Sequence, residues 1–261
     1  MGEPVQMAPE RHGASALIVP PYTELASIYD HIMQHVNYKQ WARYVVNLLV
    51  LAGLKSRNLL EAACGTGTLS ILLSKRKFSV TGFDSSDAML AIAKRKAAEE
   101  HAPIEFFRAD LTSFEVPIPV SGIICLYDSI NYLLEPESVH KFFTTAHAAL
   151  VQGGILIFDI ATEHNSLNNA SYLDEQGSIG EISYIRKSYY DPKEKIHYNE
   201  FTIKKPEGTF LEHHRERIYS IEELRRLLQL SQFHLLHLFD GFSYKEATVN
   251  SDRIHFVARA F

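Results

Sequence analysis

The stretch from Asn58 to Leu69, NLLEAACGTGTL, constrains the fold of this chain more than any other segment. A short apolar run leads into the small residues 62–67, and a helical pattern begins at Thr68. This order predicts a strand, a tight turn and the start of a helix. Small residues in such a turn let the backbone bend sharply and let a ligand approach the amide groups at the helix N-terminus. The stretch therefore predicts a nucleotide-like ligand.

Two acidic residues flank this turn. Glu61 precedes it, and Asp84 ends a second apolar run over residues 78–83. In a doubly wound sheet, an acid about 20 residues after the turn, at the end of the second strand, hydrogen-bonds ribose hydroxyls. The turn and the two acids together indicate a nucleoside site.

Strand and helix patterns alternate along the first two thirds of the chain. The expected strands are 58–62, 78–83, 104–108, 122–126 and 155–160, followed near the C-terminus by 233–239 and 253–261. Such alternation is typical of a parallel sheet built from βα units. We therefore predict an α/β fold: a Rossmann-like, doubly wound, seven-stranded sheet with helices on both faces, in which the last strand pairs antiparallel.

Three segments carry the most specific signal, and each lies at the end of an expected strand. They read Glu61-x-Ala63-Cys64-Gly65-Thr66-Gly67, Gly82-Phe83-Asp84-Ser85-Ser86-x-x-Met89-Leu90 and Arg108-Ala109-Asp110-Leu111. In this order they resemble motifs I, II and III of class I S-adenosylmethionine-dependent methyltransferases, and the resemblance covers roughly residues 22–159. The family often has glycine where Ala63 stands, and alanine is small enough to keep the turn.

The resemblance implies that the cofactor is S-adenosyl-L-methionine. The residues it implies for cofactor binding are Tyr22, Tyr29, Glu61, Ala63, Cys64, Gly65, Gly67, Asp84, Ser85, Met89, Asp110, Leu111 and Tyr127. Glu61 would balance positive charge on the amino-acid part, Asp84 would bind the ribose hydroxyls, and Asp110 would bind the adenine amino group. For Asp110 a turn cap is the alternative, and for Tyr22 and Tyr29 it is packing of their helix on the sheet.

The strand at 122–126 ends in a polar and aromatic cluster, residues 127–133. Ligands of open parallel sheets bind outside the carboxyl ends of the strands, so this cluster is aimed at the site. By analogy with the family it is motif IV. Candidate catalytic residues are Tyr127 and Asp128, together with His214 from a later segment, and Tyr132 is a candidate substrate residue.

Beyond Thr162 the pattern changes. Residues 163–180 indicate a loop, and three alternating runs at 181–190, 195–205 and 209–219 predict an antiparallel three-stranded insertion. We expect residues 163–219 to form a substrate lid over a core of residues 22–162 and 220–261. Residues 1–21, with four prolines, are expected to be a flexible leader.

The last strand of this lid carries many polar residues. Alternation puts His213, Arg215, Arg217 and Tyr219 on one face and Glu212, His214, Glu216 and Ile218 on the other. Only one face can meet the pocket, and the sequence leaves open which one. Arg215 and Arg217 are candidate substrate residues. Related methyltransferases often show an H-x-x-R-x-Y strand here. His214, Arg217 and Tyr219 match it in sequence, but alternation places them on different faces unless a bulge intervenes.

Composition narrows the class of acceptor. The 261 residues carry a net charge of −5, and this mild acidity argues against a nucleic-acid substrate. The two cysteines fit no metal-ligand spacing, and adjacent strand histidines point apart, so no metal is expected. No apolar run reaches the length of a membrane span, and a cytoplasmic protein is the simplest interpretation. An edge strand of the lid could pair with a second copy to give a homodimer.

The sequence thus predicts a methyltransferase that acts on the O or N atom of a small molecule by direct SN2 transfer, without deciding between O, N and C acceptors. A catalytically silent module that only binds the cofactor is one alternative. An NAD-dependent oxidoreductase is another, although it would be expected to show Gly-x-Gly-x-x-Gly at the turn.

Overall fold

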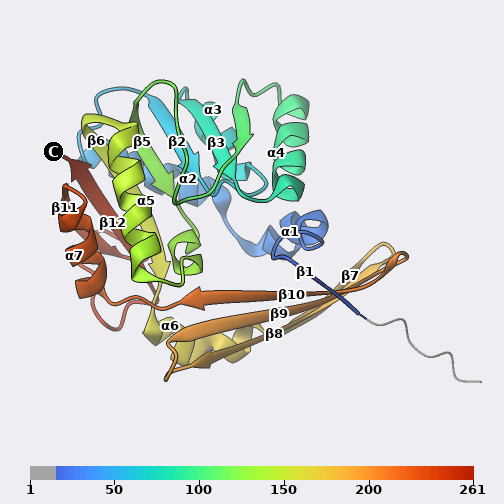
Figure 1. The fold of residues 1–261 in the computed structure, drawn as a ribbon. Coiled ribbons are helices and arrows are strands. Elements are labelled where there is room, and N and C mark those ends of the chain that lie inside the picture. Colours follow the sequence, from blue (N-terminus) through green and yellow to red (C-terminus); the bar gives the residue numbers. More distant parts are fainter. Residues whose placement is uncertain (1–15) are drawn as a thin grey trace, which may run out of the picture.

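The structure, a computed structural model, describes residues 16–261 and contains two β-sheets (Figure 1). One sheet has seven strands in the order β11-β12-β6-β5-β2-β3-β4, and the other has five in the order β1-β10-β9-β8-β7. The first fifteen residues of the expected leader lie outside the described part of the chain. Within residues 16–261 no helix is long and apolar enough to cross a membrane.

The seven-stranded sheet forms the core, and its α/β Rossmann-like character is confirmed. Its strands are β2 (Asn58–Ala62), β3 (Ser79–Asp84), β4 (Glu105–Arg108), β5 (Val120–Cys125), β6 (Leu150–Ala161), β11 (Phe233–Asp240) and β12 (Arg253–Ala260). The first five are parallel, whereas β12 pairs antiparallel with both β6 and β11. Every residue of β5 is buried, as expected for a central parallel strand covered on both faces.

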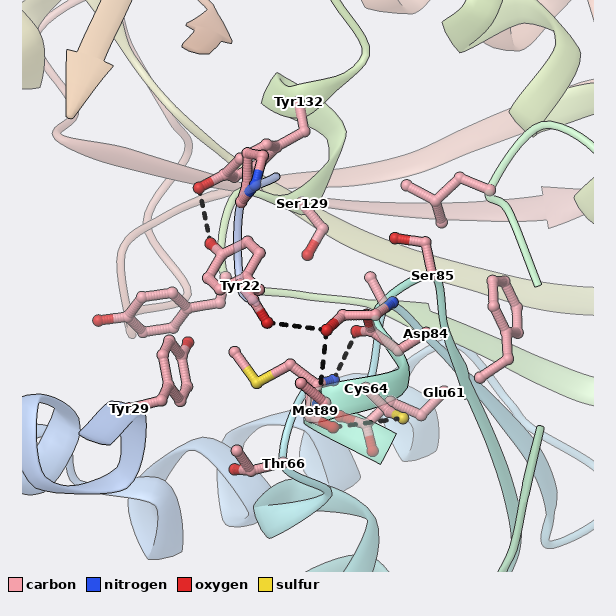
Figure 2. Close-up of a pocket in the computed structure, with 18 of the residues that line it drawn as sticks. Tyr22, Tyr29, Glu61, Cys64, Thr66, Asp84, Ser85, Met89, Ser129 and Tyr132 are labelled. Carbon is pink, nitrogen blue, oxygen red and sulfur yellow. Dashed lines mark hydrogen bonds between the residues drawn. The ribbon is translucent and has the colours of Figure 1, made fainter. Parts of the chain in front are cut away.

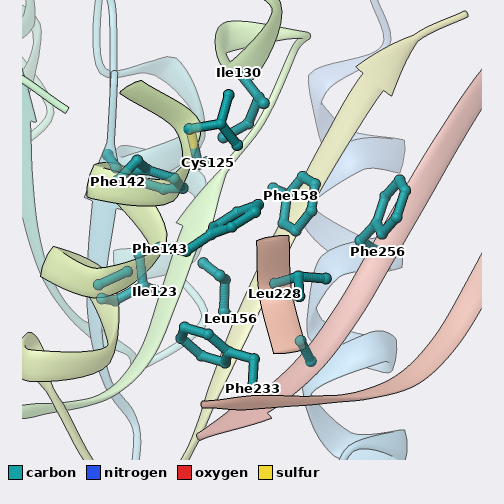
Figure 3. Packing of buried hydrophobic residues seen from close by; sticks show 14 of the residues in the cluster. Ile123, Cys125, Ile130, Phe142, Phe143, Leu156, Phe158, Leu228, Phe233 and Phe256 are labelled. Carbon is teal, nitrogen blue, oxygen red and sulfur yellow. The ribbon is translucent and has the colours of Figure 1, made fainter. Parts of the chain in front are cut away.

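Helices cover both faces of this sheet. One apolar cluster joins it to α2 (Tyr38–Leu51) and α3 (Thr68–Ser74), and another joins it to α5 (Pro136–Ala149) and α7 (Ile221–Leu230). Figure 3 shows the second cluster, in which Phe142 and Phe143 of α5 pack near Phe158 of β6 and Leu228 of α7. These apolar layers hold the strand ends rigidly in place.

Local signals fix the ends of several helices. Ser86 is the N-cap of α4 (Asp87–Glu99), and Ser220 forms a capping box with Glu223 at the start of α7. The helix expected from Tyr22 begins later, as α1 (Ala26–Ile32), and a 3-10 turn, η1 (Met33–His35), follows it. The reason is the backbone of Tyr22, whose φ of 61° is incompatible with a right-handed helix.

The second sheet differs from the expected three-stranded insertion, because it has five strands. The three predicted runs form β8 (Ile182–Asp191), β9 (Ile196–Lys205) and β10 (Gly208–Arg217). They are joined by β7 (Glu175–Ile179), from a segment expected to be a loop, and by β1 (Leu17–Val19), from the expected leader. Between β6 and β7 the chain forms α6 (Glu163–Asn169) and the 3-10 turn η3 (Ala170–Leu173).

Candidate active site

In the turn after β2, every second residue has a left-handed backbone conformation. Ala63, Gly65 and Gly67 have φ values of 53°, 55° and 72°, all in the left-handed region. A Cβ on Gly67 would lie 2.9 Å from the Phe106 ring, whereas a Cβ on Gly65 would meet no protein atom within 4 Å. Gly67 is therefore required for packing, and Gly65 leaves open space above the turn.

That open space is part of a cavity of about 750 Å³ at the carboxyl ends of β2 to β5 (Figure 2). Residues 20–23 and the side chain of Tyr29 also line it. The predicted cofactor residues that line it are Tyr22, Tyr29, Glu61, Ala63, Cys64, Gly65, Asp84, Ser85, Met89, Asp110, Leu111 and Tyr127, and the predicted substrate residue Tyr132 lines it too. Gly67 is the one predicted cofactor residue that does not, because its Cα faces Phe106.

Two carboxyl groups lie in this cavity wall, the partly buried Asp84 and the buried Glu61. Asp84 accepts hydrogen bonds from the backbone N–H of Gly65 (2.8 Å, to Oδ2) and of Ser86 (2.9 Å, to Oδ1), while burial raises its pKa. Each oxygen of Asp84 keeps a lone pair for a further donor. Glu61 is 5% exposed and accepts a hydrogen bond from the Ser70 hydroxyl, and burial raises its pKa to about 8. A cationic ligand with hydroxyl groups would match both carboxyl groups.

The far side of the cavity is more open. Asp110 is exposed and its Oδ1 accepts hydrogen bonds from the backbone N–H (2.8 Å) and the hydroxyl (2.6 Å) of Thr112, so it does cap a turn. Its Oδ2 makes no hydrogen bond within residues 16–261 and remains available at the cavity wall. Met89 is 2% exposed and presents an apolar surface there.

Sequence reasoning missed several lining residues, among them Tyr38, Trp41 and Thr66. Thr66 donates a hydrogen bond to Asp30 Oδ1 (2.6 Å), and Lys96 bonds the other oxygen of Asp30 (2.6 Å). Asp30 therefore ties α1 to the turn. Thr66 lies within the first of the three motif segments, which was the available signal, whereas Tyr38 and Trp41 lie outside all three.

The lid strand β10 presents its Glu212, His214, Glu216 and Ile218 face to the interior, where all four are buried. Arg215 and Arg217, the candidate substrate residues, belong to the other face of the strand. Arg215 is exposed above the Tyr198 ring, and Arg217 bonds the carbonyl of Leu134. The register with β9 is continuous, so no bulge brings the two faces together.

A continuous hydrogen-bond chain leads from the cavity into the lid. The hydroxyl groups of Tyr22 and Tyr132 are 2.6 Å apart, and the Tyr132 hydroxyl lies 2.9 Å from His214 Nδ1 (Figure 2 shows the two tyrosines). His214 Nε2 lies 3.1 Å from Glu212 Oε2. Because a carboxylate only accepts, a neutral His214 donates through Nε2 and accepts the Tyr132 hydroxyl at Nδ1.

Glu212 was not expected to matter, yet it anchors this chain. Its carboxylate also accepts the backbone N–H groups of Tyr22 (2.7 Å), Glu24 (2.6 Å) and Leu25 (2.9 Å). Burial opposes ionisation of Glu212, but the hydrogen bonds from His214 and the backbone outweigh it and lower its pKa. An ionised Glu212 therefore links the lid to the segment that closes the cavity.

Tyr127 and Asp128 follow β5 with φ values of 63° and 55°. Consecutive left-handed residues are strained and cluster at functional sites. Tyr127 lines the cavity, but Asp128 lies behind it and pairs with Arg253 (3.3 Å), which also bonds the buried Asp159. The Arg253 guanidinium lies 5.0 Å from the Tyr127 ring centroid. Asp128 thus supports the cavity wall without lining it.

Comparisons with known proteins agree on one class. The model of a family described as "Methyltransferase domain" matches residues 59–154. A protein provisionally named as a methyltransferase in Geobacillus sp. (strain WCH70) is 31% identical over 244 residues, covering 91% of this chain and 99% of its own.

Solved structures share the fold over nearly the whole chain. An S-adenosylmethionine-dependent methyltransferase from Clostridium acetobutylicum superposes with a TM-score of 0.77 at 26% identity, covering 92% of this chain and 98% of its own. The sugar N-methyltransferase of Streptoalloteichus sp. ATCC 53650 superposes with a TM-score of 0.71 at 18% identity, covering 99% of both chains.

Proposed function

The chain belongs to the class I S-adenosylmethionine-dependent methyltransferases, and from this premise we propose that it methylates an oxygen or nitrogen atom of a small molecule by direct SN2 transfer. The observation that carries the proposal is the cavity, which is lined by the carboxyl groups of Glu61 and Asp84 and by Tyr22 and Tyr132, whose hydroxyl groups lead to His214. A sugar N-methyltransferase among the structural neighbours supports a small acceptor.

The residues of the cavity fit the cofactor. S-adenosylmethionine, when bound, supplies a methyl group activated by a sulfonium. Glu61 would balance the positive charge of its amino-acid part, and Asp84 would accept its ribose hydroxyls. The open space above Gly65 would admit it to the backbone of the turn. Met89 and Leu111 would contact the adenine, and Asp110 would accept its amino group through the free Oδ2.

The Tyr132–His214–Glu212 chain is suited to receive a proton. When the acceptor loses its O–H or N–H proton, the Tyr132 oxygen would take that proton and pass its own to His214 Nδ1. The imidazolium formed would be stabilised by the Glu212 carboxylate 3.1 Å from Nε2. Tyr22 and Tyr132 do not ionise by themselves, because burial raises the pKa of each well above its usual value.

We assign residues 163–219 the role of a substrate lid on a core of residues 22–162 and 220–261. Tyr127 would border the acceptor, and Asp128 would act indirectly by holding Arg253 behind that ring. A lid anchored through Glu212 would exclude water from the cavity, and water exclusion strengthens the electrostatic contacts inside it.

Methyl transfer from labelled S-adenosylmethionine to a panel of amines, phenols and carboxylic acids tests this function. We expect transfer to at least one class, and we expect His214→Gln to slow it by roughly 10²-fold without changing cofactor affinity. His213→Gln is the matched control, since His213 is on the exposed face of the same strand. Cofactor binding without transfer to any member of the panel would favour the silent module.

A further inference from the structure

The inner face of the lid carries a second polar set, formed by Arg186, Asn199 and Glu216, which we call the lid triplet. Arg186 donates to Asn199 Oδ1 through Nε (3.0 Å) and Nη2 (2.7 Å), and Asn199 Nδ2 donates to Glu216 Oε1 (3.1 Å). Arg186 pairs with no carboxylate in the described part of the chain. Its positive charge and the Glu216 carboxyl group are thus held apart by one neutral amide.

Glu216 of the lid triplet lies on the same buried face of β10 as His214, which bonds the cavity residue Tyr132 (2.9 Å). After burial, the charge of Glu216 is the largest influence that raises the pKa of Tyr22, and the charge of Glu216 also raises that of Tyr132. The charge of Arg186 acts in turn on Tyr127, Asp128 and Glu216. Tyr22, Tyr127 and Tyr132 all line the cavity. The carbonyl of Arg217, the neighbour of Glu216, also accepts a hydrogen bond from Asn131 (2.8 Å), the neighbour of Tyr132. The lid triplet therefore lies beside the cavity wall.

Two atoms of the lid triplet keep unused hydrogen-bonding capacity. Arg186 Nη1 and Glu216 Oε2 make no hydrogen bond within residues 16–261. Neither atom is fully buried. Both are therefore accessible to a ligand. The guanidinium also lies over the Phe201 ring, 5.5 Å from its centroid, which orients it.

We propose that the lid triplet recognises the methyl acceptor as an amino acid or hydroxy acid, with its carboxylate against Arg186 and its amino or hydroxyl group against Glu216. A planar guanidinium matches a carboxylate and is the usual residue for that role. A single negative charge fits better than a phosphate dianion, because the lid triplet itself contains a carboxyl group, Glu216, and the charge of Asp128 acts on it. This inference rests on the proposed function of the cavity.

The test uses the full chain saturated with S-adenosylhomocysteine, at constant ionic strength. Glycine, glycolate and acetate are titrated, each beside its amide, and the shift in unfolding temperature reports binding. We expect the carboxylates to stabilise the protein more than the amides. Arg186→Gln should weaken carboxylate binding by about 10-fold or more, as expected for a lost hydrogen bond to a charged group, and Arg186→Lys should retain part of it.

Arg215→Gln, on the exposed face of the lid, is the control and should change nothing. The affinity of each variant for S-adenosylhomocysteine shows that it is folded. If Arg186→Gln does not fold, Arg186→Lys is compared with the wild type in its place. Equal binding of carboxylates and amides, or no binding of either, overturns the inference, as does wild-type carboxylate binding by Arg186→Gln. Carboxylate binding without methyl transfer to any acceptor would instead contradict the proposed function alone.

Discussion

At the scale of single residues, the turn after β2 contains residues whose conformation or burial opposes folding. Ala63 adopts a φ of 53°, which costs an L-residue roughly 1–2 kcal/mol. Glu61 is buried, and its pKa is raised to about 8. Residues that oppose folding in this way are expected where a ligand supplies the missing partner. Ala63 and Glu61 both line the cavity.

Glu61 predicts a pH dependence of stability. Its carboxyl group titrates at about 4.3 in an unfolded chain and at about 8 in the folded protein. The folded state therefore holds a proton that the unfolded state has lost, and the free energy of unfolding contributed by this group falls as pH rises from about 4.3 to about 8. Glu61→Gln should remove this loss of stability, which amounts to a few kcal/mol at the upper end of that pH range.

Urea unfolding of the ligand-free protein at several pH values measures this effect. The stability of Glu61→Gln relative to wild type should increase with pH across that window. Glu115→Gln, at an exposed position, is the control and should track the wild type throughout. A constant difference between Glu61→Gln and wild type at all pH values would show that Glu61 does not titrate in this range.

At the scale of elements, β10 and the segment before α1 are joined by one side chain. The Glu212 carboxylate accepts three backbone N–H groups from residues 22–25. In Glu212→Gln an amide nitrogen replaces one acceptor oxygen, and buried N–H groups left unpaired cost about 1–3 kcal/mol each. We predict that the amides of Tyr22, Glu24 and Leu25 exchange with solvent at least roughly 10-fold faster in this variant.

Hydrogen exchange resolved by residue measures that prediction. Glu200→Gln is the matched control, because Glu200 lies on the neighbouring strand and faces His213 on the outside of the lid. Unchanged protection of the three amides in Glu212→Gln would mean that other contacts hold the segment in place.

Elements with a clear local pattern could be predicted from the sequence. The strands β2 to β5, the turn after β2 and the capping box of α7 all follow from periodicity and capping residues within short windows. The elements that were missed depend on distant partners. β1 forms only because Leu17–Val19 pairs with Phe210–Glu212, and β7 packs closely because Gly177 leaves room for the Tyr184 ring.

The same limit applies to the site. Cofactor residues could be predicted because their motifs are local, and all but Gly67 line the cavity. Alternation correctly divided β10 into two faces, but which face meets the cavity depends on how the lid docks onto the core. For this reason the sequence could not place Arg215 and Arg217 relative to the cavity. No local pattern marked Glu212, since its partners lie in a segment nearly the whole chain length away.

At the scale of the whole molecule, the cavity lies at the carboxyl ends of the core strands, and the lid contacts its wall through the hydrogen bond between Tyr132 and His214. The core sheet contributes the carboxyl groups of Glu61 and Asp84 to the cavity wall, and His214 and the lid triplet lie on the inner face of the lid beside it. The core side is suited to a cationic nucleoside, and the lid side is suited to the acceptor. This division predicts that cofactor affinity depends on the core residues alone.

Calorimetric titration with S-adenosylmethionine tests that central claim most directly. We predict binding at one site in the wild type and an affinity about 10- to 100-fold lower in Asp84→Asn, since hydrogen bonds to a charged group contribute about 1.5–3 kcal/mol. Glu105→Gln, exposed on the neighbouring strand, should bind like the wild type. No binding at millimolar cofactor, or equal affinity in wild type and Asp84→Asn, would contradict the assignment of this cavity.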